Sequence, residues 1–209
     1  LSGAASAASA TAPATGGTGT PAPAARAYTI CDLDPSTGRF ALDFVLHGHG
    51  PAARWGAKAE VGQTIKLSGP LGRSRLEGRH RRYLLAGDTT ALPAIREWLA
   101  AIGSEAAVAV QVWAPDVGEH QDLEFSGELT VDWSYGGAPT MADLAEAGRL
   151  GPDGWNPQDP DTKFFLAGEA SEITRVRRAL TQAGPVPPGN LQATPYWRRG
   201  QSGADPASR

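Results

Sequence analysis

The sequence lacks the features that mark disulfide-bonded, membrane-spanning and nucleic-acid-binding proteins. Its single cysteine, Cys31, excludes an internal disulfide, and with only four histidines to help it argues against a thiolate zinc site. No stretch approaches the roughly 20 apolar residues that a membrane helix requires. The net charge of −3 gives no general attraction to nucleic acid or to an anionic membrane. We therefore expect neither as a partner, and the lone cysteine fits a reducing cytoplasm.

Residues 1–25 contain no charge and, after Leu1, consist of Ala, Gly, Ser, Thr and Pro. They lack the basic start and apolar centre of a secretory signal. Such a segment buries too little surface to offset the entropy of ordering, so we predict a disordered low-complexity tail here and a second over 201–209. The first residue is Leu rather than Met, which suggests an unusual start codon, trimming or a fragment.

The next segment, 26–72, reads as short strands separated by glycine turns. From Phe40 to His47 apolar residues occupy every second position, the period expected when one strand face is buried. Pro51 is a suitable first residue for a short helix. The predicted elements are antiparallel strands at 26–33 and 39–46, a helix at 51–60 and a strand at 63–68. They fit the back half of a small antiparallel barrel.

Residues 73–82 form a basic connector with five arginines and one histidine against one glutamate. Its simplest interpretation is a solvated linker between domains. A nucleic-acid-binding patch is disfavoured because no aromatic residue interleaves the arginines.

Strands and helices alternate from Tyr83 onward, which predicts a mostly parallel sheet with helices on its faces. Thr90 and Thr140 are candidate helix caps, and Trp98 and Trp113 lie in apolar segments that predict core positions. The predicted strands are 83–86, 107–113, 129–133, 163–167 and 191–196, and the predicted helices follow Ala91 and span 140–147 and 172–183. No G-x-G-x-x-G follows any strand, so the common dinucleotide fingerprint is absent.

A dinucleotide cofactor requires a positive fork and closely approaching backbone amides for its pyrophosphate. Arg26 offers the charge, and the small residues that offer the approach are Gly48, Gly50, Ala52 and Ala53. Tyr28 or Trp55 offers an aromatic face for a flat ring. An ordinary hairpin and its turn remain the alternative. His47 and His49 lack a third and fourth ligand, so we predict no metal site.

Four blocks of the sequence occur in a recognisable order. They are RAYTICDLDPSTGRFALDFVLHGHGPAARW continued by VGQTIKLSGPLG, then YLLAGDTTALPAI, FFLAGEAS and YWRRG. Together they resemble the siderophore-interacting protein family, the FAD-dependent ferric-siderophore reductases, from Arg26 to Gly200. The resemblance implies an FAD-binding antiparallel β-barrel over 26–72, followed by a ferredoxin-reductase-like α/β NAD(P)-binding domain over 83–200. Because the low-complexity tail stands where the family has its earlier strands, we expect the barrel to be partial.

The resemblance also implies roles for individual residues. Arg26 is expected at the pyrophosphate, Tyr28 and Thr29 at the isoalloxazine, and the stretch His47, Gly48, Gly50, Pro51, Ala52, Ala53 and Trp55 around the phosphate and adenine. In the second domain, expected near the flavin ring and the pyridine nucleotide, are Asp88, Thr90, Ala91, Gly168 and Glu169. The two acids could equally be helix caps. Arg198 and Arg199 are candidates for docking an anionic siderophore, with exposed charge as the alternative.

The function that the resemblance implies is an oxidoreductase that passes electrons from NAD(P)H or ferredoxin through FAD to a ferric siderophore. No protein nucleophile, base or metal ligand is needed for this chemistry. The basic connector could then face the siderophore or the extra phosphate of NADPH. Two alternatives are a siderophore-binding or interaction module that no longer holds flavin, and a reductase with another acceptor.

Overall fold

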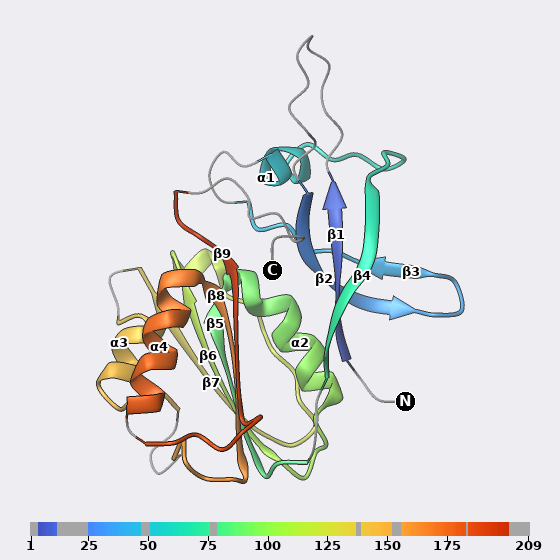
Figure 1. Cartoon of the computed structure of the whole chain (residues 1–209). Helices are drawn as coiled ribbons and strands as arrows, with labels where there is room; N and C mark the ends of the chain where they lie inside the picture. The colour runs from blue at the N-terminus through green and yellow to red at the C-terminus, as the bar shows by residue number, and fades with distance from the viewer. Residues whose placement is uncertain are drawn as a thin grey trace. The chain divides into compact units, whose positions relative to one another are not determined.

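The computed structural model describes residues 4–11, 25–46, 51–75, 79–136, 139–151, 156–182 and 184–200. They form two compact units (Figure 1), which we call the N-terminal unit, Ala4–Arg75, and the C-terminal unit, Leu76–Arg199. None of the helices in the described part of the chain combines the length and apolarity that a bilayer crossing demands.

The N-terminal unit is an antiparallel sheet with strand order β3-β2-β1-β4. Its elements are β1 Ala4–Thr11, β2 Ala25–Asp34, β3 Arg39–Ala41, α1 Pro51–Gly56 and β4 Lys66–Arg75. The sequence predicts a partial antiparallel β-barrel for this half, and the structure confirms the antiparallel strands, which form a four-stranded sheet.

The predicted disorder of residues 1–25 is wrong for Ala4–Thr11. This segment is strand β1, which pairs with β2 from Ser6↔Ile30 to Thr11↔Ala25 and with β4 on its other side. Its backbone groups find partners in two neighbouring strands, and this pairing needs no large apolar side chain. Residues 1–3, 12–24 and 201–209, which also belong to the predicted tails, lie outside the described part of the chain.

The second predicted strand, 39–46, is also wrong in extent, because β3 ends at Ala41. Phe44 instead packs against Tyr28 of β2 and Trp55 of α1, with ring centroids 4.7 and 5.3 Å away. The alternating pattern does not bury one face, since Phe40 is 38% exposed and Leu46 is 63% exposed. Helix α1 begins at Pro51 as predicted but ends at Gly56, four residues early.

The C-terminal unit is a parallel sheet with strand order β7-β6-β5-β8-β9, as the alternating sequence pattern predicts. Its strands are β5 Arg82–Asp88, β6 Ala107–Ala114, β7 Glu128–Tyr135, β8 Thr162–Glu169 and β9 Leu191–Trp197. Helix α2, Leu92–Ala101, covers one face, and α3, Met141–Glu146, and α4, Ala170–Gln182, cover the other (Figure 1). With β4 reaching Arg75 and β5 beginning at Arg82, both ends of the predicted connector 73–82 are strand.

Strand β8 is buried along its whole length and serves two cores. Because neighbouring strand residues point to opposite faces, adjacent phenylalanines separate. Phe165 stacks on Trp98 of α2, with ring centroids 4.0 Å apart. Phe164 packs in the cluster that contains Ile173 and Val176 of α4.

The order of the strands reverses between β5 and β8. The chain leaves β5 through α2 toward β6 on one side, and it leaves β8 through α4 toward β9 on the other. In open parallel sheets such a reversal opens a crevice at the carboxyl ends of the two strands, and ligands bind there.

Candidate functional site

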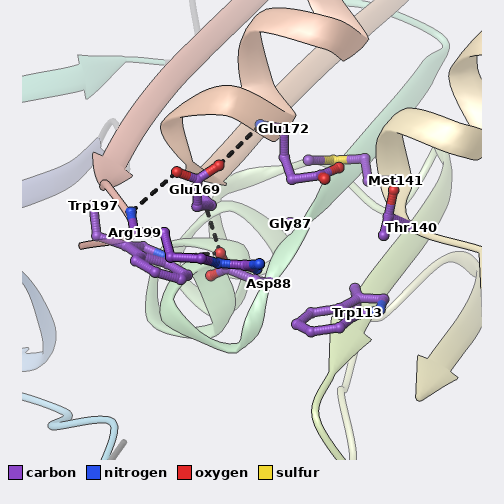
Figure 2. Close-up of a pocket in the computed structure, with 9 residues that line it drawn as sticks. All are labelled: Gly87, Asp88, Trp113, Thr140, Met141, Glu169, Glu172, Trp197 and Arg199. Carbon is purple, nitrogen blue, oxygen red and sulfur yellow. Dashed lines mark hydrogen bonds between the residues drawn. The ribbon is translucent and has the colours of Figure 1, made fainter. Parts of the chain in front are cut away.

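A pocket lies at the carboxyl ends of the strands of the C-terminal unit and encloses about 400 Å³ of empty space, its open mouth included. Figure 2 shows the side chains that surround it. They come from the ends of β5, β6, β8 and β9 and from the first turns of α3 and α4. The lining residues are Gly87, Asp88, Trp113, Thr140, Met141, Glu169, Glu172, Trp197 and Arg199.

The Asp88 carboxylate ties the ends of three strands together. Its Oδ1 accepts hydrogen bonds from the backbone N–H of Thr90, at 2.9 Å, and from the Thr90 hydroxyl. Its Oδ2 accepts from the backbone N–H of Glu169, at 2.9 Å, and from Nε1 of Trp197, at 2.8 Å. Burial raises the pKa of Asp88, against the opposing effect of these hydrogen bonds. Asp88, and not Thr90 as predicted, therefore caps the turn after β5.

Two glycines allow this close assembly. A Cβ on Gly87 would lie 2.3 Å from the carbonyl oxygen of Ala167 and 2.5 Å from the Cβ of Ala91. A Cβ on Gly168 would lie 2.6 Å from Asp88 Oδ2, and Gly168 has φ +148°, which L side chains rarely adopt. Strands β5 and β8 can approach each other at the pocket only because both positions lack a side chain.

Glu169 fills the start of α4 with its own carboxylate. Oε2 accepts from the backbone N–H groups of Ser171, at 2.7 Å, and Glu172, at 3.1 Å, and Oε1 accepts from the backbone N–H of Arg199, at 3.2 Å. Burial opposes its ionisation, but the hydrogen bonds from Ser171 and from the backbones of Arg199 and Glu172 outweigh it and lower the pKa of Glu169. The carboxylate is thus ionised and fully engaged.

Helix α3 is capped in the same way. Thr140 and Asp143 form a reciprocal capping box, which confirms Thr140 as the predicted cap. Glu172 accepts a hydrogen bond from the backbone N–H of Ala142 at 3.3 Å. Four N–H groups in the first turns of α3 and α4 therefore already have carboxylate or hydroxyl partners and are not free to bind a phosphate; they belong to Ala142, Asp143, Ser171 and Glu172.

The other walls are aromatic. Trp113 and Trp197 line the pocket, and the buried Nε1 of Trp113 has no hydrogen-bond partner among the described residues. An unpaired buried donor is costly unless a ligand or water accepts from it. With two indoles in its lining, and with the guanidinium of Arg199 offsetting part of the charge of the three carboxylates, the pocket suits a flat group.

Helix α3 is held against α4 by Arg175. Its guanidinium contacts Glu146 at 2.9 Å, Asp143 at 2.9 Å and Glu172 at 3.5 Å. Because hydrogen bonds from Thr140 and Arg175 favour its charged form, the pKa of Asp143 falls to about 2. This ion-pair network fixes Thr140 and Met141 at the pocket wall.

In the N-terminal unit, the predicted flavin-side residues Tyr28 and Trp55 are brought together by Phe44, which lies between them. Gly56 permits this contact, since a Cβ there would lie 3.0 Å from the Cβ of Phe44. Thr29, Ala52 and Ala53 lie partly exposed in β2 and α1. His47, Gly48, His49 and Gly50, and the side chains of Arg26 and Pro51, lie outside the described part of the structure.

The structure brings Asp88, Glu169 and Arg199 of the predicted site together in one pocket. Thr90 donates a hydrogen bond to Asp88, and Gly168 leaves the space that Asp88 Oδ2 occupies. Ala91 is buried next to Gly87, and Arg198 is exposed. Trp98 is core as predicted, whereas Trp113 is pocket wall rather than core. The residues that sequence reasoning missed are Trp113, Met141, Glu172, Trp197 and Phe44. A signal existed for Trp113, which stands near the carboxyl end of a predicted parallel strand.

No metal centre emerges in the described ranges, where no group of three or more His, Cys, Asp or Glu side chains could hold an ion. His47 and His49, for which the sequence predicts no metal site, lie outside the described part of the structure.

Family models match most of the chain. One described as "Siderophore-interacting protein" matches residues 80–200, and one described as "Siderophore-interacting FAD-binding domain" matches residues 8–74. The second match begins inside β1, well before the predicted start of that domain at Arg26.

Curated relatives include the ferric vibriobactin reductase ViuB of Vibrio cholerae serotype O1, which is 30% identical over 181 residues. The match covers 85% of this chain, but only 65% of the length of ViuB. The mycobactin import ATP-binding/permease protein IrtA of Mycobacterium tuberculosis is 29% identical over 187 residues, covering 85% of this chain and 20% of IrtA.

Among solved structures, a siderophore utilization protein from T. fusca is 26% identical with a TM-score of 0.80, covering 98% of this chain and 83% of that one. The siderophore-interacting protein SipS from Aeromonas hydrophila is 26% identical with a TM-score of 0.76, covering 94% and 84%. A ferredoxin NADP+ reductase from Neisseria gonorrhoeae shares the fold at 14% identity and a TM-score of 0.60, covering 94% and 87%.

Proposed function

Since the chain belongs to the siderophore-interacting protein family, we propose that it is an FAD-dependent oxidoreductase that reduces ferric siderophores and releases ferrous iron. NAD(P)H is the proposed electron donor, and reduced ferredoxin is the alternative donor. We place the reaction in the cytoplasm, where pyridine nucleotides are available.

The observation that carries the proposal is the pocket at the reversal between β5 and β8, combined with the match of the preceding unit to an FAD-binding domain. The indole side chains of Trp113 and Trp197 suit the nicotinamide ring. The capped starts of α3 and α4 argue that the nucleotide phosphates bind elsewhere.

The flavin is assigned to the N-terminal unit. Tyr28, Phe44 and Trp55 form an aromatic cluster that fits the side of a flat ring, and Arg26 lies two residues before Tyr28 on β2. Bound FAD supplies the electron-transfer chemistry, and the residues of the chain bind and orient the reactants. Arg26 is proposed to neutralise the pyrophosphate, and Tyr28 and Trp55 to hold the ring in position.

The substrate explains why no catalytic side chain is needed. Ferric iron is a hard cation held by catecholate or hydroxamate oxygens. One added electron lowers its charge, weakens each iron–oxygen bond and lets the metal leave. We propose Arg198 and Arg199 as cations that attract the anionic ferric complex.

The first test is the visible spectrum of the purified chain during titration with FAD. Arg26→Ala should weaken FAD binding about tenfold to a hundredfold, because it removes a charge-assisted contact. Arg79→Ala is the matched control, since the Arg79 side chain is 94% exposed. An unchanged FAD affinity in Arg26→Ala would refute the role of Arg26, and no flavin binding at micromolar FAD would favour a binding module.

The flavin-loaded protein should then reduce a ferric catecholate or ferric hydroxamate complex, measured as ferrous iron captured by a chromogenic chelator. NADH and NADPH are supplied in separate assays. Failure with both nucleotides, together with activity from a chemically reduced flavin, would identify another donor.

A further inference from the structure

The wall of the pocket that is formed by Trp197 and Arg199 is not fixed by regular sheet pairing. Strand β9 lies at the edge of the sheet, and its register against β8 shifts between the pairs Gly168↔Pro195 and Glu169↔Trp197. Pro195 also has no backbone N–H to donate. The ladder is therefore irregular just where β9 becomes pocket wall.

Two carboxylates, the half-buried Asp88 and the buried Glu169, hold this segment instead. Asp88 Oδ2 accepts from Nε1 of Trp197, and Glu169 Oε1 accepts from the backbone N–H of Arg199. Figure 2 shows Trp197 and Arg199 on one side of the pocket, close to Asp88 and Glu169. Of these two hydrogen bonds, the one to Asp88 holds a side chain, and it therefore determines the position of the indole ring of Trp197.

Asp88 has no spare capacity for another role. A carboxylate offers about four acceptor positions, and Asp88 uses them on two donors from Thr90, one from Glu169 and one from Trp197. Gly168 leaves the space for Oδ2, since any Cβ there would collide with it.

We propose that Asp88 is a positioning residue that, through Nε1 of Trp197, fixes the indole wall of the pocket and thereby sets the affinity for the pyridine nucleotide. This inference rests on the proposed function for the identity of the ligand. It does not rest on that function for the hydrogen bond itself.

Two substitutions separate the contact from the bulk of the side chains. Asp88→Leu keeps a side chain of similar size and removes both carboxylate oxygens, so that nothing at this position accepts from Nε1 of Trp197. Trp197→Phe keeps an aromatic wall and removes the N–H. Trp98→Phe is the matched control, because Nε1 of Trp98 is buried with no hydrogen-bond partner among the described residues, and Trp98 is not part of the pocket lining.

The first measurement is the dissociation constant of the FAD-loaded protein for NADH and NADPH, determined by titration calorimetry. Trp197→Phe should raise the dissociation constant of the more tightly bound nucleotide by about tenfold, which is the loss typical of a hydrogen bond to a charged group. Asp88→Leu should weaken binding at least as much, and the double variant no further than Asp88→Leu alone, because both changes remove the same contact. Trp98→Phe should bind like the parent.

The second measurement needs no nucleotide. Acrylamide quenching of Trp197 is obtained as the difference between a protein and its Trp197→Phe counterpart, and it should rise in the Asp88→Leu background. Unchanged quenching, or parental nucleotide affinity in Trp197→Phe, would overturn the inference. Should Asp88→Leu fail to fold, Trp197→Phe alone decides.

The failures are distinguishable. A parent protein that binds neither NADH nor NADPH would refute the nucleotide part of the proposed function and the affinity part of this inference. The quenching experiment would still decide whether Asp88 holds Trp197.

Discussion

The two units of the molecule differ in what holds them together. Among the described side chains, Cys31 is the single buried apolar residue of the N-terminal unit, whereas β5, β6, β8 and the helices of the C-terminal unit bury the rest. Most of the large exposed apolar side chains belong to the N-terminal unit: Leu33, Phe40, Leu46, Val61 and Leu67. One unit is stabilised by a hydrophobic core, and the other chiefly by strand pairing.

This difference suits the proposed division of labour. A unit with little core gains most from a ligand that binds only its folded state, because the binding free energy adds to its stability. A unit with a dense core can instead hold side chains such as Asp88 and Trp197 in fixed positions for a ligand that binds reversibly. The predictions below test this comparison.

The largest expected difference concerns two phenylalanines. Phe165 is 0% exposed and Phe40 is 38% exposed. Phe165→Ala should lower the free energy of unfolding by about 3–5 kcal/mol, as in other core truncations. Phe40→Ala should lower it by less than about 1 kcal/mol. Urea unfolding followed by circular dichroism measures both, and equal losses would contradict the contrast between the units.

Two glycines give the next comparison. Gly168 has φ +148°, and a Cβ there would collide with Asp88. Gly38 has φ +70°, and a Cβ there would have none of the described residues within 4 Å. Gly168→Ala should cost about 3 kcal/mol, from strain and overpacking together, and should weaken nucleotide binding. Gly38→Ala should cost about 1 kcal/mol from its backbone conformation alone. Thermal unfolding measures the loss of stability in both variants. A smaller loss in Gly168→Ala than in Gly38→Ala would show that the pocket tolerates movement of Asp88.

The smallest effects concern two carboxylates with opposite pKa shifts. Hydrogen bonds from Ser36 and Thr37 lower the pKa of Asp34 from 3.8 to about 2, and burial raises that of Asp88 above 3.8. The stabilisation from Asp34 is present above its ordinary pKa and is lost as the pH falls through about 2. For Asp88 the pH dependence is the opposite. Its contribution to folding stability is greatest below pH 3.8 and is lost as the pH rises through its raised pKa.

Carboxyl-carbon chemical shifts recorded against pH measure both groups directly, with Asp34→Asn and Asp88→Asn to assign the signals. Titration of Asp88 at or below pH 3.8 would show that its four hydrogen bonds outweigh its burial.

The sequence predicted the C-terminal unit well for a physical reason. Strands that are buried on both faces appear as short apolar runs, and β5, β6 and β8 each contain the predicted stretch. In the N-terminal unit the same reasoning failed twice. Strand β1 carries no apolar signal, and the alternating residues after Ala41 leave the sheet because Phe44 packs between Tyr28 and Trp55.

The site was predictable where a motif and a strand end coincide, as at Asp88 and Glu169. A residue could not be predicted as part of the pocket wall where only the tertiary structure brings it there. Met141 and Glu172 belong to helices whose first turns meet only after α3 packs on α4. Trp197 lay inside the YWRRG block, but its hydrogen bond to Asp88 has no counterpart in local sequence.

The contact between Asp88 and Trp197 spans 109 residues of chain. A ribosome adds about 5–20 residues each second, so about 5–20 s of synthesis separate the two partners. During that interval β5 can form with the donor for Asp88 Oδ2 still unmade. The pocket therefore comes into being late, and a nascent chain that has folded most of its parallel sheet does not yet have a complete place for a nucleotide.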